Sequence, residues 1–108
     1  MGVSKVKDYN QNILEFSRLT KALGHPARMT IVEHLAKSNK CITDHIVNEL
    51  PLSQSTVSQH LRELKAAGLV NGEIEGNAVC YCLNIKAFER WNQYCALLLQ
   101  KIHQNNCC

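Results

Sequence analysis

The sequence lacks the features that mark membrane, secreted or low-complexity proteins. No apolar run approaches the roughly 20 residues that span a bilayer, and the polar N-terminus has no apolar signal core. There is also no repeat, no biased tract and no linker that would divide the 108 residues. We therefore expect one domain over residues 1–108, in the cytoplasm and without membrane contact.

Signatures of an enzyme are missing as well. The chain contains no nucleophile elbow, no phosphate-binding loop and no paired-carboxylate site, and its predicted helices and hairpin use almost all of its length. A catalytic thiol would need a base within hydrogen-bond reach and a pocket beside it. We expect a protein that is not an enzyme.

Positively charged residues only slightly outnumber negatively charged ones. There are 12 Lys and Arg against 9 Asp and Glu, a formal net charge of +3, which permits a nucleic-acid partner without proving one. Hydrophobic residues make up 45% and charged residues 19% of the chain, as in globular proteins. Because a chain this short buries only part of its surface, its apolar helices would gain a core by pairing with a second copy.

Apolar residues at helical spacing predict two helices in the first part of the chain. The first runs over about 8–23 and ends at Gly24, where a left-handed cap would suit glycine. Pro26 opens the second, which ends near 38–39. The predicted buried positions are Ile13, Leu14, Leu19, Ala22 and Leu23 in the first helix, and Met29, Ile31, Val32 and Leu35 in the second.

A short helix, a tight corner and a longer helix follow, which is the order of a helix-turn-helix. Thr43 is the expected cap of the helix 44–50, and Ser53 that of the helix from 54 to about 67, which Gly68 ends. The predicted inward residues of these two helices are Ile46, Val47, Leu50, Val57, Leu61 and Leu64.

The hydrophobic period then changes to that of strands. A run over 71–75 leads to a turn at 76–77, and in the segment 78–84 that follows, Val79, Tyr81 and Leu83 alternate with Cys80 and Cys82. A hairpin, or wing, is therefore expected over about 70–84. The last helix, about 86–104, has a wide aromatic and aliphatic stripe, which indicates an interface with a partner chain, packed with the first helix. This stripe contains Phe88, Trp91, Tyr94, Cys95, Leu98, Leu99 and Ile102.

The outer face of the helix 54–67 carries hydrogen-bonding groups and no acid, since helical spacing turns Glu63 away from it. Gln amides can pair with adenine and Ser hydroxyls with a base or a phosphate, whereas the long cationic side chains further along the helix are better placed for phosphates. The predicted DNA contacts are Gln54, Ser55, Ser58, Gln59, Arg62 and Lys65, and Arg28, Lys37 and Lys40 would extend the basic surface.

Two other interpretations of this face remain open. A polar helix face can simply be solvated, and some winged helices bind proteins. Protein-binding modules tend to show acidic or apolar residues here, and a hairpin directly after the helix is a specific order of elements. We therefore favour double-stranded DNA, with a near-palindromic operator for a two-fold symmetric dimer.

Three segments resemble the ArsR/SmtB family of bacterial repressors: 22–28 (ALGHPAR), 52–61 (LSQSTVSQHL) and 64–70 (LKAAGLV). The resemblance covers nearly the whole chain. It implies a mainly α winged helix-turn-helix with a small β-hairpin, and a homodimer through the first and last helices. It also implies a repressor that leaves its operator when an inducer binds. Carried over by position, the groove contacts would be Gln54, Ser55, Ser58 and Gln59, with the wing over 73–78 touching the minor groove or the backbone.

Six cysteines make a thiophilic inducer the first expectation. In a reducing cytoplasm they should be free thiols. Cys80 and Cys82 are two apart on a strand and so share a face, while Cys107 and Cys108 are adjacent at the chain end. Soft thiolates favour thiophilic ions, so trivalent arsenic or antimony, bound by three thiolates, fits this inventory and the family's sensing habits, and cadmium, zinc or copper(I) would fit too.

Two other sensing sites of the family fit this chain poorly. The run 41–44 (CITD) departs from the family's Cys-Val-Cys-Asp site, because Thr43 replaces the second thiolate. The family's site for zinc, nickel or cobalt uses carboxylates and histidines on the last helix. Here that helix offers only Glu89 near its start and His103 near its end, which are too far apart to share one ion within a subunit.

The cysteines also allow a redox function and a purely structural one. Some relatives sense persulfides or oxidants, and here Cys41 with Cys107 or Cys95 would be the pair. In the structural alternative, Cys80 and Cys82 are small strand residues, Cys95 belongs to the core and Cys107 lies in an unstructured tail.

Overall fold

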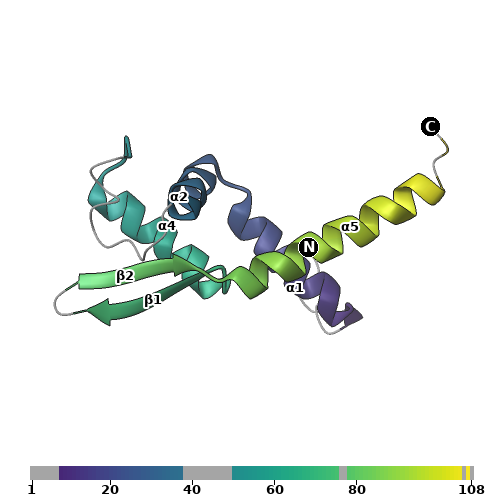
Figure 1. Ribbon diagram of the computed structural model, residues 1–108, viewed down its shortest axis with the longest axis horizontal. Coiled ribbons are helices and arrows are strands. Elements are labelled where there is room, and N and C mark those ends of the chain that lie inside the picture. Colours follow the sequence, from purple (N-terminus) through teal and green to yellow (C-terminus); the bar gives the residue numbers. More distant parts are fainter. Residues whose placement is uncertain (1–7, 38–49, 76–77, 106, 108) are drawn as a thin grey trace.

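The computed structural model describes residues 8–37, 50–75, 78–105 and 107. These residues form helices and one antiparallel two-stranded hairpin (Figure 1), which confirms the predicted fold class. The predicted third helix, with its cap Thr43, lies outside the described residues except for Leu50. The elements are α1 (Gln11–Leu23), α2 (Pro26–Ala36), α4 (Gln54–Ala66), β1 (Val70–Glu75), β2 (Ala78–Leu83) and α5 (Ile85–Gln104).

Side-chain caps set where the first two helices begin. The Asn10 carboxamide oxygen accepts from the Asn12 N–H at 2.7 Å, so α1 starts three residues later than predicted. His25 caps α2 through Nδ1, which accepts from the Ala27 N–H at 3.1 Å. Pro26 is the first residue of α2, as predicted, because its missing N–H is no loss there.

The two helix-ending glycines differ in conformation. Gly68 has φ +88° and is the one described residue in the left-handed region. Gly24 has φ −80°, so the prediction of a left-handed cap at that position is wrong. The α1 helix instead ends with the Gly24 N–H bonded to the Lys21 carbonyl at 3.2 Å, a turn that needs no special backbone.

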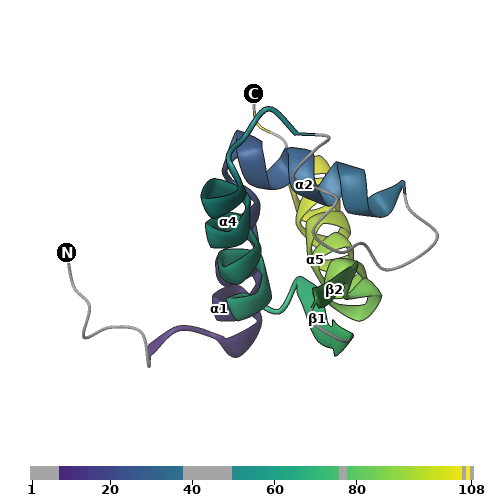
Figure 2. The ribbon, with the colours of Figure 1, turned by 90° about the vertical axis from the view of Figure 1, so that its left-hand side faces the viewer.

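One apolar core lies between α2, α4 and the start of the hairpin, with α1 along its side (Figure 2). Leu50 and Leu52 pack against this core. Met29 was expected inside but is 39% exposed, because α2 turns its Ile31 and Val32 side inward. Ile13 was also expected inside but is 42% exposed, because it borders an open hollow between the start of α1 and the second half of α5. The core residues are Leu19, Ala22, Ile31, Val32, Leu35, Val57, Leu61, Leu64, Ala67, Leu69, Val70 and Ala87.

Asn84 joins the recognition region, the hairpin and the last helix. Its Nδ2 donates to the Gly68 carbonyl at 2.9 Å, and its own N–H donates to the Leu69 carbonyl at 2.8 Å. Its Oδ1 also accepts from the Ala87 N–H at 3.4 Å as the N-cap of α5. One residue, through its side chain and its backbone N–H, therefore fixes the end of α4, the base of the wing and the start of α5 relative to one another.

We expect Gly68→Ala to lower the free energy of unfolding by about 1–2 kcal/mol, because a Cβ disfavours the left-handed backbone even where space is open. Urea denaturation followed by circular dichroism measures the change. Gly24→Ala is the matched control and should stay within about 1 kcal/mol of wild type, since its φ is negative. Equal losses in both variants would contradict this explanation.

Candidate nucleic-acid interface

Helix α4 begins at a serine cap. The Ser53 hydroxyl accepts from the Thr56 N–H at 3.3 Å and lies 2.8 Å from the Thr56 hydroxyl and 3.2 Å from that of Ser55. This confirms the predicted cap. These contacts among three side chains stabilise the first turn of α4, which is the turn expected to approach base edges.

The buried stripe of α4 determines which side chains face outward. Val57, Leu61 and Leu64 are at most 4% exposed, so the opposite side of the helix faces solvent. Ser58 is half-buried at the edge of this outer face. The remaining predicted contacts, Gln54, Ser55, Gln59, Arg62 and Lys65, are all exposed.

Gln59 is held between two charged neighbours on this face. Its Oε1 accepts from Arg62 Nη2 at 2.9 Å, and its Nε2 donates to Glu63 Oε1 at 3.3 Å. Helical spacing placed Glu63 away from the groove side, but its carboxylate reaches the edge of that side through Gln59. An acid therefore borders the predicted reading surface and orients one of its amides.

Behind the outer face, His60 connects α4 to α2. Arg28 Nε donates to His60 Nδ1 at 3.2 Å, and Arg28 Nη1 donates to the Ala22 carbonyl at 3.4 Å. The His25 ring lies 4.6 Å from that of His60. Burial lowers the pKa of His60 below 6.5, His25 and Arg28 lower it further, and Glu63 opposes them. Sequence reasoning assigned Arg28 to the basic surface and missed this partly buried contact, which joins residues 32 positions apart.

The wing is a regular antiparallel pair. Val70 pairs with Leu83 and Glu75 with Ala78, which places the predicted turn at 76–77 at its tip. The tip itself lies outside the described residues. Because Val70 is buried and continuous with the core below α4, the base of the wing is fixed against the recognition helix.

The cysteines differ in accessibility. Cys80 is 4% exposed, whereas Cys82, two residues along β2, is half-buried, and Cys95 in the middle of α5 is half-buried too. Cys107, beyond the end of α5, is exposed. Cys41 and Cys108 lie outside the described residues.

These thiols are not gathered into one site within the described part of a single chain. The hairpin and the C-terminal end of α5 lie at opposite ends of the molecule, whose long axis is 52 Å (Figure 1). No group of three or more His, Cys, Asp or Glu in residues 8–37, 50–75, 78–105 and 107 is arranged to hold a metal ion. Cys80, Cys82 and Cys107 of the same chain therefore do not form a three-thiolate site.

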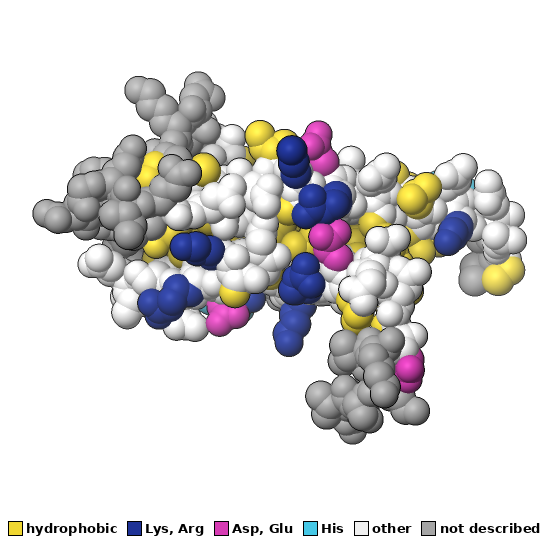
Figure 3. All heavy atoms as spheres, turned by 90° about the horizontal axis from the view of Figure 1, so that it is seen from below, with side chains coloured by type: hydrophobic (Ala, Val, Ile, Leu, Met, Phe, Trp, Pro, Cys, Tyr) yellow, Lys and Arg dark blue, Asp and Glu magenta, His cyan; other side chains and the backbone are white. Residues whose placement is uncertain are grey.

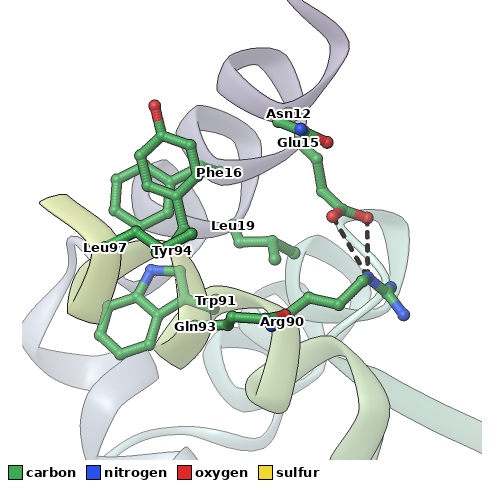
Figure 4. Close-up of a pocket in the computed structure, with 9 residues that line it drawn as sticks. All are labelled: Asn12, Glu15, Phe16, Leu19, Arg90, Trp91, Gln93, Tyr94 and Leu97. Carbon is green, nitrogen blue, oxygen red and sulfur yellow. Dashed lines mark hydrogen bonds and ion pairs between the residues drawn. The ribbon is translucent and has the colours of Figure 1, made fainter.

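Helices α1 and α5 form a second surface, built on aromatic contacts. The Phe16 ring stacks on Tyr94 at 4.3 Å and on Trp91 at 6.2 Å, and Trp91 Nε1 donates to the Thr20 hydroxyl at 3.0 Å. Arg90 Nε bridges both Glu15 oxygens at 3.1 and 3.2 Å (Figure 4). A hollow of about 150 Å³ remains between the two helices. The predicted packing of the first helix with the last is therefore confirmed.

Beyond this contact the apolar stripe of α5 faces solvent. Leu97, Leu98, Leu99 and Ile102, in the second half of α5, are 45–55% exposed. Leu97 and Leu98 border open hollows beside the start of α1. Figure 3 shows apolar side chains reaching the surface on this half of α5, and Lys and Arg side chains across the middle of the same view. No helix among the described residues is long and apolar enough to cross a membrane.

A recognition helix held on an apolar core and followed by a two-stranded wing defines the winged helix-turn-helix class. A sequence profile described as "Bacterial regulatory protein, arsR family" matches residues 25–72. The arsenical resistance operon repressor of Staphylococcus xylosus is 32% identical over 79 residues, which are 73% of this chain and 75% of that repressor. The chain belongs to the arsR family, in agreement with the expectation that it is not an enzyme.

The transcriptional repressor SmtB of Mycobacterium tuberculosis is 46% identical over 65 residues, 60% of this chain. The chain covers 47% of that repressor, about half its length. An ArsR-like transcriptional regulator from Rhodococcus has the same fold, with a TM-score of 0.75 at 19% identity over 88% of this chain and 89% of that one. The cadmium metal-sensor CmtR of M. tuberculosis has a TM-score of 0.54 at 35% identity, over 66% of this chain and 73% of that one.

We predict that stability depends on His60 in mildly acidic solution. Because the pKa of His60 is lowered in the folded chain, the unfolded chain takes up the proton at a higher pH. The free energy of unfolding should be at its full value above pH 6.5 and should decrease as pH falls from there toward the lowered pKa. Urea titrations at a series of pH values measure this decrease.

His60→Gln keeps an acceptor for Arg28 and removes the titrating ring, so its decrease should be smaller than that of wild type. His103→Gln, at an exposed position near the end of α5, is the control and should keep the wild-type pH dependence. An unchanged decrease in His60→Gln would show that other groups cause the acid sensitivity.

Proposed function

We propose that this protein is a transcriptional repressor that binds double-stranded operator DNA through α4 and its wing. The observation that carries the proposal is the outer face of α4, where exposed amides, hydroxyls and cations lie opposite a fully buried stripe. Such groups suit base edges near the start of the helix and phosphates further along it. Relatives named as transcriptional repressors support the same function, which would place the protein with DNA in the cytoplasm.

The proposal includes a homodimer formed through α1 and α5. The exposed Leu97, Leu98, Leu99 and Ile102 leave an apolar stripe in water that a second copy of the same stripe would cover. A two-fold dimer would present two recognition helices to one duplex, and its operator would then be near-palindromic.

We further propose that a thiophilic inducer, arsenite, antimonite or a soft metal ion, releases the repressor from DNA. Support comes from relatives: one is named for an arsenical resistance operon, and another is a cadmium metal-sensor. Cys107 is exposed and Cys82 half-buried, so these thiols are accessible, while the buried Cys80 is less so. Because the two ends of one chain are far apart, an ion bound by Cys82 and Cys107 would draw them from different subunits.

Direct readout by α4 predicts a selective effect of Ser58→Ala combined with Gln59→Ala. Affinity for the operator should fall by at least tenfold, since a bidentate base contact contributes about 1–3 kcal/mol of discrimination. Affinity for random-sequence duplex should change little. Fluorescence anisotropy at fixed salt measures both affinities, and the sequence protected from nuclease should be near-palindromic.

The control for this pair is Ser17→Ala with Gln104→Ala, the same residue types at exposed positions on α1 and α5. It should bind both duplexes like wild type. Equal losses on operator and random duplex in the α4 variant would argue against base readout. Failure of the wild type to bind any duplex would favour a protein-binding winged helix.

The inducer is tested by release from operator DNA. Reduced protein on its own promoter is titrated with arsenite, antimonite, cadmium, zinc and a persulfide donor, and anisotropy is followed. Arsenite or a soft metal should release the DNA, and release should be lost in Cys80→Ser/Cys82→Ser or Cys107→Ser/Cys108→Ser. Release by the persulfide donor alone, reversed by reductant, would instead support the redox alternative of Cys41 with Cys107 or Cys95.

A further inference from the structure

A basic cleft lies between α1, α2 and the second half of α4. It has a volume of about 250 Å³ and is open to solvent on one side. Three cations line it from two helices, together with one acid at its α4 edge. The lining residues are Arg18, Lys21, Ala22, Arg28, Glu63, Ala66 and Ala67.

Arg28 is the oriented member of this set. Its guanidinium has five N–H donors, and the bonds to His60 and to the Ala22 carbonyl use two of them. These two bonds hold the planar group at the wall of the cleft and leave donors for a ligand. A guanidinium fixed before binding loses less side-chain entropy per new hydrogen bond.

Arg18 and Lys21 bring two positive charges to the cleft. They lie three residues apart on α1 and therefore on one face of that helix. Both are exposed, and within the part of the chain that the structure describes neither side chain makes an ion pair or hydrogen bond. The one acid at the cleft, Glu63, accepts a hydrogen bond from Gln59 on the outer face of α4. The cleft is therefore a net positive site with unused donors.

We propose that this cleft binds a phosphate group of the DNA backbone, next to the groove that α4 enters. The inference rests on the proposed function and adds a phosphate contact from α1 and α2 to it. The cleft is smaller than the roughly 300–1,000 Å³ of pockets that enclose whole small molecules, so it suits one group of a larger polyanion. It also adjoins the predicted reading face, because Glu63 belongs to the cleft and bonds Gln59 of that face.

The test is the salt dependence of DNA binding by the full chain. Each lost phosphate contact lowers the slope of log K against log salt by about 1. Each of the two clefts in the proposed dimer would lose its one phosphate contact. Arg18→Ala combined with Lys21→Ala should therefore lower the slope by about 2 per dimer, with similar losses on operator and random duplex because phosphates carry no sequence. Lys21→Ala alone leaves Arg18 and Arg28 in each cleft and should lower the slope by less.

Lys101→Ala removes the same charge from an exposed position on α5, remote from the cleft, and should leave the slope unchanged. Sedimentation checks that every variant keeps the wild-type oligomeric state. Circular dichroism checks that every variant folds. A wild-type slope in the double variant, while wild type still binds operator, would overturn the cleft proposal and leave the proposed function intact. If wild type binds no duplex, the proposed function itself fails.

A second arm separates DNA phosphate from a free anion. Calorimetric titration of the DNA-free protein with inorganic phosphate should give no binding at millimolar concentrations, because one exposed ion lacks the other contacts of a duplex. Phosphate binding that disappears in Arg18→Ala/Lys21→Ala, together with an unchanged salt slope, would assign the cleft to a free anion and overturn the proposal.

Discussion

The arrangement of this protein depends on the burial of one stripe of α4. Val57, Leu61 and Leu64 fill the core against α2 and the first residues of the hairpin. Once these side chains are removed from water, the helix cannot rotate about its axis without exposing them, at a cost of about 1.5–3 kcal/mol each. That constraint determines which amides, hydroxyls and cations face outward, and therefore which surface is offered to a partner.

The same helix is also constrained from its sides. His60 accepts from Arg28 across the α2–α4 contact, while Gln59 is held between Arg62 and Glu63 on the outer face. These two neighbouring residues therefore have different roles: His60 holds α4 against α2, and Gln59 presents its amide on the outer face. Asn84 adds a third constraint, because its side chain donates to the Gly68 carbonyl just after α4 and also caps α5.

The two ends of the molecule differ in how fully they are packed. The core below α4 is closed, whereas α5 extends beyond α1 with half-exposed leucines and a hollow beside Phe16. An isolated chain gains little from an apolar helix in water. The incomplete burial of α5 and the accessible thiols at opposite ends are both consistent with a function that needs two copies of the chain.

Residue pattern alone determined the helices of the described residues, the hairpin, the Ser53 cap and the outward face of α4, because these depend on local periodicity and on caps a few residues away. It erred at Gly24, Ile13 and Met29, because how a helix ends and which side chains it buries depend on packing. Only the tertiary structure decided that Arg28 meets His60, that Glu63 reaches Gln59, and that Cys80 is buried and far from Cys107. Those facts depend on how separate helices are placed in space or on how individual side chains are oriented, and no spacing along the chain encodes them.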